Sequence, residues 1–166
     1  MSDLKAAREH PEDLLWDNLK AAHAGMLGVE GGPRHMQPMA HFPDPDNRRL
    51  WFLTRRDTEL YERLRSGAAA HFVLVSKSQD FHACLDGEIS ERFDRERLDE
   101  IWGPAVSAWF EGKDDPQLKM LALDLKSAGI WASTGSSLAF FWETAKANMQ
   151  ENTTPDVGVH RELAFT

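Results

Sequence analysis

Residues 34–65 constrain the fold of this chain more than any other stretch, because they predict two adjacent strands, a sharp turn and a short helix. Side chains in 34–42 fall into two alternating sets, which suits a strand with one buried face. The sequence PDPDN at 43–47 is a cluster of turn residues, and LWFLT at 50–54 is a short apolar run fit for a buried strand. A helix is expected over 58–65.

The loop that leads from the second expected strand into this helix, residues 54–58, has the sequence TRRDT. Its two arginines and two threonines lie just before a helix N-terminus, where unpaired backbone N–H groups attract anions. The loop therefore indicates an anion-binding site. A solvated basic loop is the alternative that these residues leave open.

The rest of the chain predicts further strands, mostly joined by hairpins, and helices at the start, middle and end. Gly87, inside a long expected strand, indicates a β-bulge or a close backbone approach, and Asp94 is expected to cap a helix. The sum is a mainly β (α+β) protein, a six-stranded antiparallel barrel with peripheral helices. We expect one domain over 1–166, with a core of about 11–150 and a C-terminal tail, 151–166, that ends in a docked strand. The other expected helices are 11–24, 94–102 and 138–150, and the other expected strands are 26–30, 69–76, 81–93, 118–125 and 129–133.

Composition excludes several classes of function. A net charge of −8 without a basic stripe argues against nonspecific nucleic-acid binding. There is no apolar run of membrane-spanning length, no apolar signal core and only one cysteine, so we expect a cytoplasmic protein without nucleic-acid or membrane partners. Six tryptophans and nine phenylalanines are many for 166 residues, which suggests a dimer interface or a pocket for a flat ligand.

Candidate catalytic groups are few. No HExxH, paired-cysteine, GxGxxG or Walker pattern occurs, and the histidines are scattered, so we expect no metal site. Cys84 lies mid-strand among apolar residues, where a thiol is usually inert, and the serines of STGSS lack the context of a nucleophile elbow. We assign no catalytic residue. If the protein is an enzyme, a cofactor is expected to supply the chemistry.

Five segments in order, RHMQPM, LWFLTRRDT, DFHACLDGEIS, IWGPAVSAWFEG and LKMLALDLKSAGIWAS, resemble the general stress protein 26 family. That family belongs to the pyridoxamine 5′-phosphate oxidase-like, FMN-binding split barrels. The similarity covers roughly residues 13–149, and IWGPAVSAWFEG is its most family-specific part. The resemblance implies a split-barrel homodimer with two FMN sites between the subunits.

The resemblance also assigns residues to the flavin site. The strand 34–38 would border the flavin, the backbone of 52–54 would line it, and the turn 55–58 would hold the phosphate. Trp131 would approach the flavin from the partner chain, and Trp109 and Phe110 would lie near the subunit interface. Met36, Phe52 and Trp131 could build an apolar wall. The expected cofactor-binding residues are Arg34, Met36, Gln37, Phe52, Leu53, Thr54, Arg55, Arg56, Thr58, His82 and Trp131.

Two departures from the family pattern change what is expected. Where relatives carry a basic phosphate ligand after Thr58, this chain has Glu59 and Leu60, and a lost charged hydrogen bond costs about 1.5–3 kcal/mol. FMN binding is then weak, or Arg55 or Arg56 replaces the missing cation. Met39 stands where the oxidases have a substrate-binding lysine, and their C-terminal arginine and histidine region is absent. We therefore expect no vitamin B6 oxidase activity.

Three functional hypotheses remain open. The protein is an FMN-dependent oxidoreductase that takes electrons from a small-molecule donor, a noncatalytic FMN-binding stress protein, or a cofactor-free dimeric barrel with a degenerate flavin site.

Overall fold

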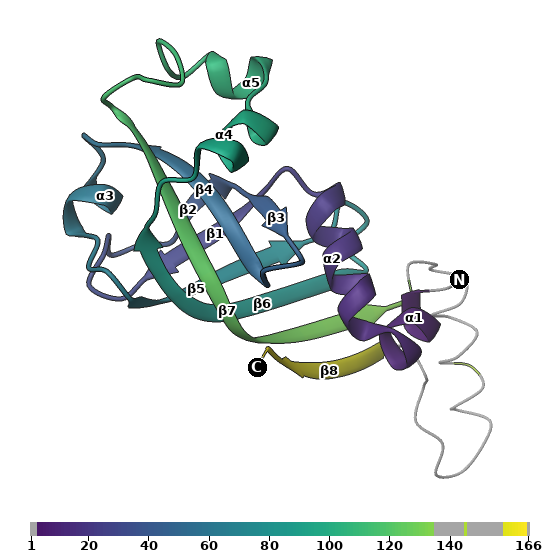
Figure 1. Cartoon of the computed structure of the whole chain (residues 1–166). Coiled ribbons are helices and arrows are strands. Elements are labelled where there is room, and N and C mark those ends of the chain that lie inside the picture. The colour runs from purple at the N-terminus through teal and green to yellow at the C-terminus, as the bar shows by residue number, and fades with distance from the viewer. Residues whose placement is uncertain (1–2, 135–144, 146–157, 166) are drawn as a thin grey trace.

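The computed structural model describes residues 3–134, 145 and 158–165 (Figure 1). They form one curled antiparallel sheet with short helices around it. The helices are α1 (Asp3–Glu9), α2 (Pro11–Ala21), α3 (Glu59–Arg63), α4 (Arg95–Ile101) and α5 (Pro104–Ser107). The strands are β1 (Ala24–Val29), β2 (Gln37–Ala40), β3 (Phe42–Asp44), β4 (Arg49–Arg55), β5 (Ala68–Val75), β6 (Phe81–Glu91), β7 (Leu118–Ser133) and β8 (Gly158–Ala164).

The strands follow the order β2-β1-β5-β6-β7-β4-β3, and β8 adds to β7. β7 is sixteen residues long and ties the sheet together, because residues 118–124 pair with β4, residues 127–133 pair with β8, and β6 runs along its other side. The β6–β7 register shifts at Gly87, where an added Cβ would lie 2.1 Å from the carbonyl oxygen of Asp124. The bulge and close backbone approach expected at this glycine are confirmed.

A single residue, His41, closes the sheet into a barrel. β2 forms one edge of the sheet and β3 forms the other, yet only His41 separates them in the chain. Since consecutive Cα atoms are about 3.8 Å apart, the two edges must meet, and a sheet whose edges meet has to curl. The curl is visible in Figure 1, where β4 and β7 cross in front of the other strands.

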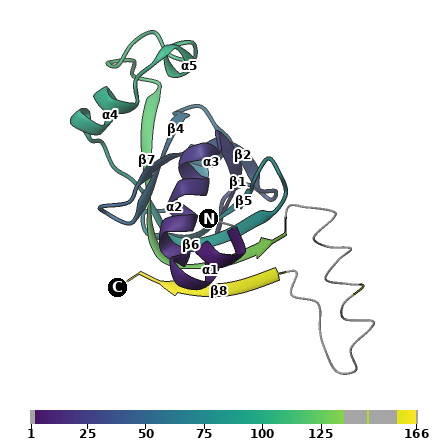
Figure 2. The same ribbon diagram turned by 90° about the vertical axis from the view of Figure 1, so that its right-hand side faces the viewer.

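The larger apolar cluster fills the inside of the curled sheet. Phe52 of β4 and Phe72 of β5 are fully buried there, with ring centroids 5.4 Å apart. α2 lies across the barrel (Figure 2), and its buried residues Leu14, Leu15, Trp16 and Leu19 join this cluster. A smaller cluster lies on the other face of β4 and β7, where Leu98 of α4 packs with Trp51 and Met120.

Local sequence signals explain where the helices begin. The Thr58 hydroxyl accepts a hydrogen bond from Tyr61 N at 3.3 Å, and the Asp94 carboxylate accepts one from Arg97 N at 2.9 Å, as expected of capping residues. α2 begins at Pro11 with acidic residues in its first turn. α1 was not predicted, because its seven residues are mostly polar and its packing partners, which include β7 and β8, are far away in the sequence.

The mainly β, antiparallel barrel with few helices is confirmed, and β8 is the expected strand at the end of the tail. The strand count was too low, since the described residues form eight strands rather than six. Residues 118–125 and 129–133 were expected as two strands but form one, because pairing with β6 continues between them. Residues 34–36 lie outside β2, since its pairing with β1 ends at Leu27 and Gln37. The expected helix over 138–150 lies outside the described residues apart from Ala145.

Candidate functional site

The barrel is split between β2 and β4. β3 pairs with β4 only as far as Phe42 and Trp51. Beyond that point β4 remains paired with β7, and β2 is paired with β1. Two strand edges, 37–40 and 52–55, therefore diverge, and within the described part of the chain neither has a strand partner on the side that faces the split. Backbone N–H and C=O groups on such edges are available to a ligand.

A pocket of about 740 Å³ opens at this split. Pro38, Met39 and Ala40 of β2 and Leu53 of β4 line one side of it. The segment 103–109, which contains α5, lines the other side, and Trp109 in this segment is 73% exposed. The ionisable lining residues are Lys20, His23 and His41, with no carboxylate among them. The pocket is therefore mainly apolar, with a few basic groups, which suits a flat apolar ligand with an anionic part.

The two threonines of the predicted phosphate loop are already hydrogen-bonded. The Thr58 hydroxyl donates to Arg55 O at 2.8 Å and accepts from Tyr61 N. The Thr54 hydroxyl lies 3.0 Å from the Thr58 hydroxyl. Thr54 must be the donor of this bond, because the Thr58 hydroxyl already donates its only proton to Arg55 O. These bonds set the shape of the loop, and they leave the Thr58 hydroxyl little capacity to donate to a phosphate.

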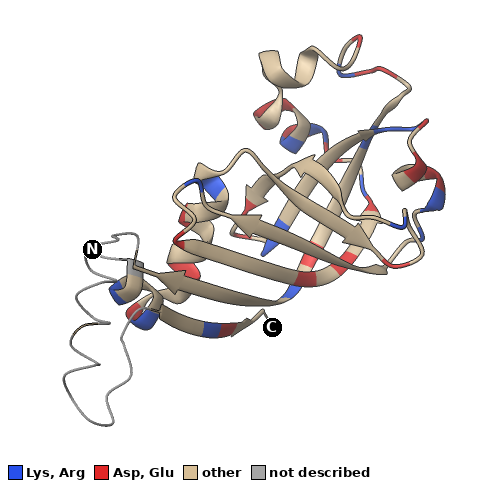
Figure 3. Ribbon diagram, turned by 180° about the vertical axis from the view of Figure 1, so that it is seen from behind, with Lys and Arg blue, Asp and Glu red and all other residues tan. Residues whose placement is uncertain are grey.

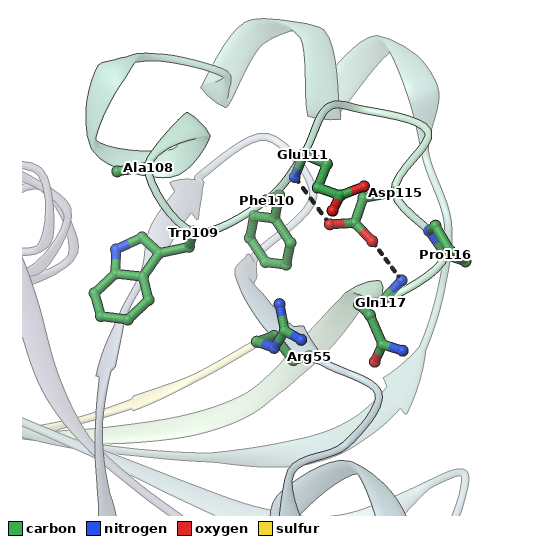
Figure 4. A pocket seen from close by; sticks show the side chains of 8 residues that line it. All are labelled: Arg55, Ala108, Trp109, Phe110, Glu111, Asp115, Pro116 and Gln117. Atoms are coloured by element: carbon green, nitrogen blue, oxygen red, sulfur yellow. Dashed lines mark hydrogen bonds between the residues drawn. The ribbon is translucent and has the colours of Figure 1, made fainter.

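Arg55 is neutralised by acidic neighbours. Its Nε and Nη2 donate to the two carboxylate oxygens of Asp57 at 3.1 and 3.3 Å, which raises the pKa of Arg55 and lowers the pKa of Asp57. The guanidinium points into a separate pocket of about 460 Å³ below Phe110 (Figure 4). There Asp115 accepts hydrogen bonds from Glu111 N and Gln117 N, which hold the pKa of Asp115 below its usual value.

The other predicted phosphate ligands lie apart from Arg55. Arg34 is exposed and lines a pocket of about 650 Å³ with Met36 on the outside of the sheet. Arg56 is exposed and lines a pocket of about 390 Å³ beside α3. Leu60 is 2% exposed and belongs to the barrel core, so its position offers nothing to a phosphate. The three arginines therefore face three different pockets.

His82 of β6 and Trp131 of β7 are directly opposite in the strand register, so their side chains lie on the same face of the sheet. They lie toward the other end of β7 from the predicted phosphate loop. The loop joins β7 at Leu118, opposite Arg55, and Trp131 comes thirteen residues later in the same strand. An extended strand of that length spans up to about 43 Å. The predicted phosphate loop and the His82–Trp131 pair therefore lie toward opposite ends of β7.

One expectation for a single side chain needs correction, and one buried histidine was not singled out from the sequence. The Phe52 side chain was expected to help build an apolar wall, but it is buried in the barrel core, so only its backbone can face a ligand. His41 was not predicted to matter. It is buried, its Nε2 lies 2.8 Å from the carbonyl oxygen of Leu19, and its Nδ1 has no hydrogen-bond partner in the described part of the chain. Burial lowers the pKa of His41, so the ring is held neutral with its proton on Nε2.

Residues 3–134, 145 and 158–165 contain no group of three His, Cys, Asp or Glu side chains that could hold a metal ion. In the same residues, no helix is both long and apolar enough to cross a membrane.

The curled sheet and the opening between β2 and β4 define a split-barrel protein. The chain belongs to the pyridoxamine 5′-phosphate oxidase-like family, which residues 10–156 match. This confirms the family expected from the sequence.

Similar proteins place the chain among the general stress protein 26 homologues. General stress protein 26 of Bacillus subtilis (strain 168) is 26% identical over 99 residues, or 58% of this chain and 69% of that protein. A crystal structure described as a general stress protein 26 from Jannaschia sp. CCS1 is 34% identical and covers 96% of this chain and 99% of that one, with a TM-score of 0.78. The general stress FMN/FAD binding protein of Xanthomonas citri is 34% identical and covers 78% of this chain and 92% of that one, with a TM-score of 0.69.

Proposed function

We propose that this chain is a flavin-binding stress protein that takes FMN into a site shared by two identical subunits. The observation that carries the proposal is the split between β2 and β4, with its two free strand edges and its apolar pocket. The FMN/FAD binding of the Xanthomonas citri relative supports the choice of ligand.

The split suits the isoalloxazine ring. This ring is flat and apolar, with hydrogen-bonding groups along one edge, and it needs an apolar wall beside a row of backbone donors and acceptors. Gln37 and the backbone of Leu53 and Thr54 would provide the polar edge. Pro38 and the Leu53 side chain would provide the wall, whereas Met36 lines the pocket on the outside of the sheet.

The phosphate would be held less well. Arg34 and Arg56 are exposed and each lines a different pocket, whereas Arg55 is paired with Asp57. The loss of one charged hydrogen bond at Leu60 weakens binding by roughly ten- to a hundredfold. The chain would therefore bind FMN with only a modest advantage over riboflavin, which lacks the phosphate.

The second subunit would contribute His82 and Trp131. The outer face of the sheet, opposite the core, exposes Met26, Val75 and Trp131. The sequences of β1, β2 and β5 contain no Lys, Arg, Asp or Glu, although 28% of the chain is charged. Seen from behind, the charged residues gather on the helices and loops and leave much of the sheet uncharged (Figure 3). Depletion of charge is typical of the core of a protein interface.

Bound FMN supplies hydride and single-electron transfer chemistry. The described residues would bind and orient the ring and exclude water from it. An oxidoreductase with a small-molecule electron donor and a noncatalytic flavin carrier both fit this arrangement. A cofactor-free dimer is the second candidate, because Leu60 is buried in the core and Arg55 is already paired with Asp57.

The absorbance of the purified protein tests the proposal. A flavin band that stays with the protein through gel filtration, or saturable binding when FMN is titrated into flavin-free protein, is the expected result. If FMN at high micromolar concentration leaves the protein colourless and its fluorescence unchanged, the cofactor-free candidate is correct. Subsequent reduction of the bound flavin by a nicotinamide donor, with turnover, would distinguish an oxidoreductase from a carrier.

A further inference from the structure

An ordered pair of aromatic rings lies on the outer face of the sheet. The Trp131 indole and the His160 imidazole are stacked, with centroids 4.8 Å apart and planes inclined by 14°. They come from β7 and β8, at positions directly opposite in the strand register, and His82 occupies the matching position on β6. β8 begins just after residues 10–156, which match the family, so His160 lies outside the matched part of the chain.

Gly129 helps to fix the indole. An added Cβ at this glycine would lie 2.9 Å from Cη2 and 3.2 Å from Cζ3 of Trp131, so the indole passes directly over it. The ring is therefore held by the sheet below and by His160 on one face. Trp131 nevertheless remains 46% exposed, so the parts of the ring that do not contact Gly129 or His160 keep accessible surface. An exposed indole held in one plane is a ready surface for stacking on another flat ring.

We propose that His160 is a positioning residue of the flavin site, which holds the Trp131 indole so that its uncovered face stacks on the flavin bound in the partner subunit's split. The inference rests on the proposed function, and it adds a residue that neither the sequence patterns nor the family resemblance indicated. The physical basis is the entropy of binding. An exposed indole loses rotational freedom when a ligand binds, and a stacked imidazole removes that freedom before binding, so the cost is smaller.

A double-mutant cycle in the full chain tests this role. The variants are His160→Ala, His160→Phe, Trp131→Ala and the double variant, with Arg161→Ala as the control, because Arg161 neighbours His160 on the opposite face of β8. Two quantities are measured for each: the dissociation constant of FMN, and the fluorescence of the bound flavin, which a stacked indole quenches. Sedimentation of each variant checks that the subunits still associate.

His160→Ala is expected to weaken FMN binding by about three- to tenfold, because the free energy of an aromatic pair corresponds to a change of that size. The fluorescence of the bound flavin should increase. His160→Phe should restore both quantities, since a phenyl ring can stack in the same place. In the Trp131→Ala background, removal of the imidazole should have no further effect, which a merely structural role would not predict.

The proposal is overturned if His160→Ala binds FMN as wild type does with equally quenched flavin, if His160→Phe fails to restore either quantity, or if the effects of His160→Ala and Trp131→Ala simply add. These results differ from a failure of the proposed function, in which the wild-type protein itself binds no flavin.

Discussion

Nε2 of His41 lies 2.8 Å from the carbonyl oxygen of Leu19, and this contact joins the end of α2 to the one residue that links the two edges of the sheet. Nε2 donates a hydrogen bond to the carbonyl, while Nδ1 is buried and has no partner among the described residues. A second proton on this ring would place an unpaired charge beside Phe72, whose ring lies 4.9 Å away. The contact therefore works only with a neutral imidazole.

Stability is expected to fall as the solution becomes mildly acidic. Burial lowers the pKa of His41 below its ordinary value of 6.5, so below about pH 6.5 the unfolded chain takes up a proton that the folded chain does not. The free energy of unfolding then decreases by up to about 1.4 kcal/mol per pH unit. His41→Gln, which keeps a donor and cannot titrate, should flatten this dependence in urea unfolding between pH 7.5 and 5.5. The exposed His35→Gln is the control, and an unchanged slope in His41→Gln would show that another group is responsible.

Gly87→Ala is expected to destabilise the barrel by about 2 kcal/mol or more, because the new methyl group would collide with backbone rather than with a flexible side chain. The carbonyl of Asp124 cannot move without breaking the pairing of β7. Gly112→Ala, where the added Cβ meets open space, should change stability little. Equal unfolding midpoints for the two variants would contradict the close approach.

A hybrid dimer tests the shared site directly. Leu53→Trp should fill the split and Trp131→Ala should remove the partner's ring, so each variant alone should bind FMN poorly. A dimer with one subunit of each kind, isolated with two affinity tags, contains one site built from an intact split and an intact Trp131. It should bind close to one FMN per dimer with near wild-type affinity, as measured by fluorescence titration. A hybrid that binds no better than its parents would show that the two groups do not share a site.

Arg56 is expected to contribute more to FMN binding than Arg55. Arg55 is held by Asp57, and using it for a phosphate would cost the existing pair. Arg56→Ala should therefore weaken FMN binding by about tenfold, and Arg55→Ala by clearly less. Riboflavin, without a phosphate, should bind both variants as it binds the wild type. A larger effect of Arg55→Ala would place the phosphate in the pocket below Phe110 instead.

Glu59→Lys is expected to tighten FMN binding, because it exchanges an acidic side chain at the start of α3 for a cation where the family resemblance implies a basic residue. Its cost is small, since the pair that Glu59 forms with Arg63 at 3.1 Å is exposed. The gain should reach about tenfold for FMN and be absent for riboflavin. Equal gains for both ligands would mean that the charge acts on something other than the phosphate.

Sequence reasoning succeeded where the cause is local. Strand alternation, the cap at Asp94 and the bulge at Gly87 appear in the structure as expected. The turn expected over 43–47 lies at 45–48, because residues 43 and 44 pair with β4. The same reasoning missed α1 and divided β7, because both depend on which distant strands provide a partner. Leu60 shows the limit of sequence reasoning for the site. The sequence shows that this position carries no charge, but only the structure shows that the side chain lies in the core.

The sequence by itself determined the mainly β class, the starts of α2 and α4, and the set of basic and aromatic residues that a flavin site would use. Only the tertiary structure decided that Arg34, Arg55 and Arg56 face different pockets, that Trp131 stacks on His160, and that Trp131 and the phosphate loop lie at opposite ends of β7. The physical reason is that a strand's pattern records which of its faces is buried, but not which other strand, edge or subunit will bury it.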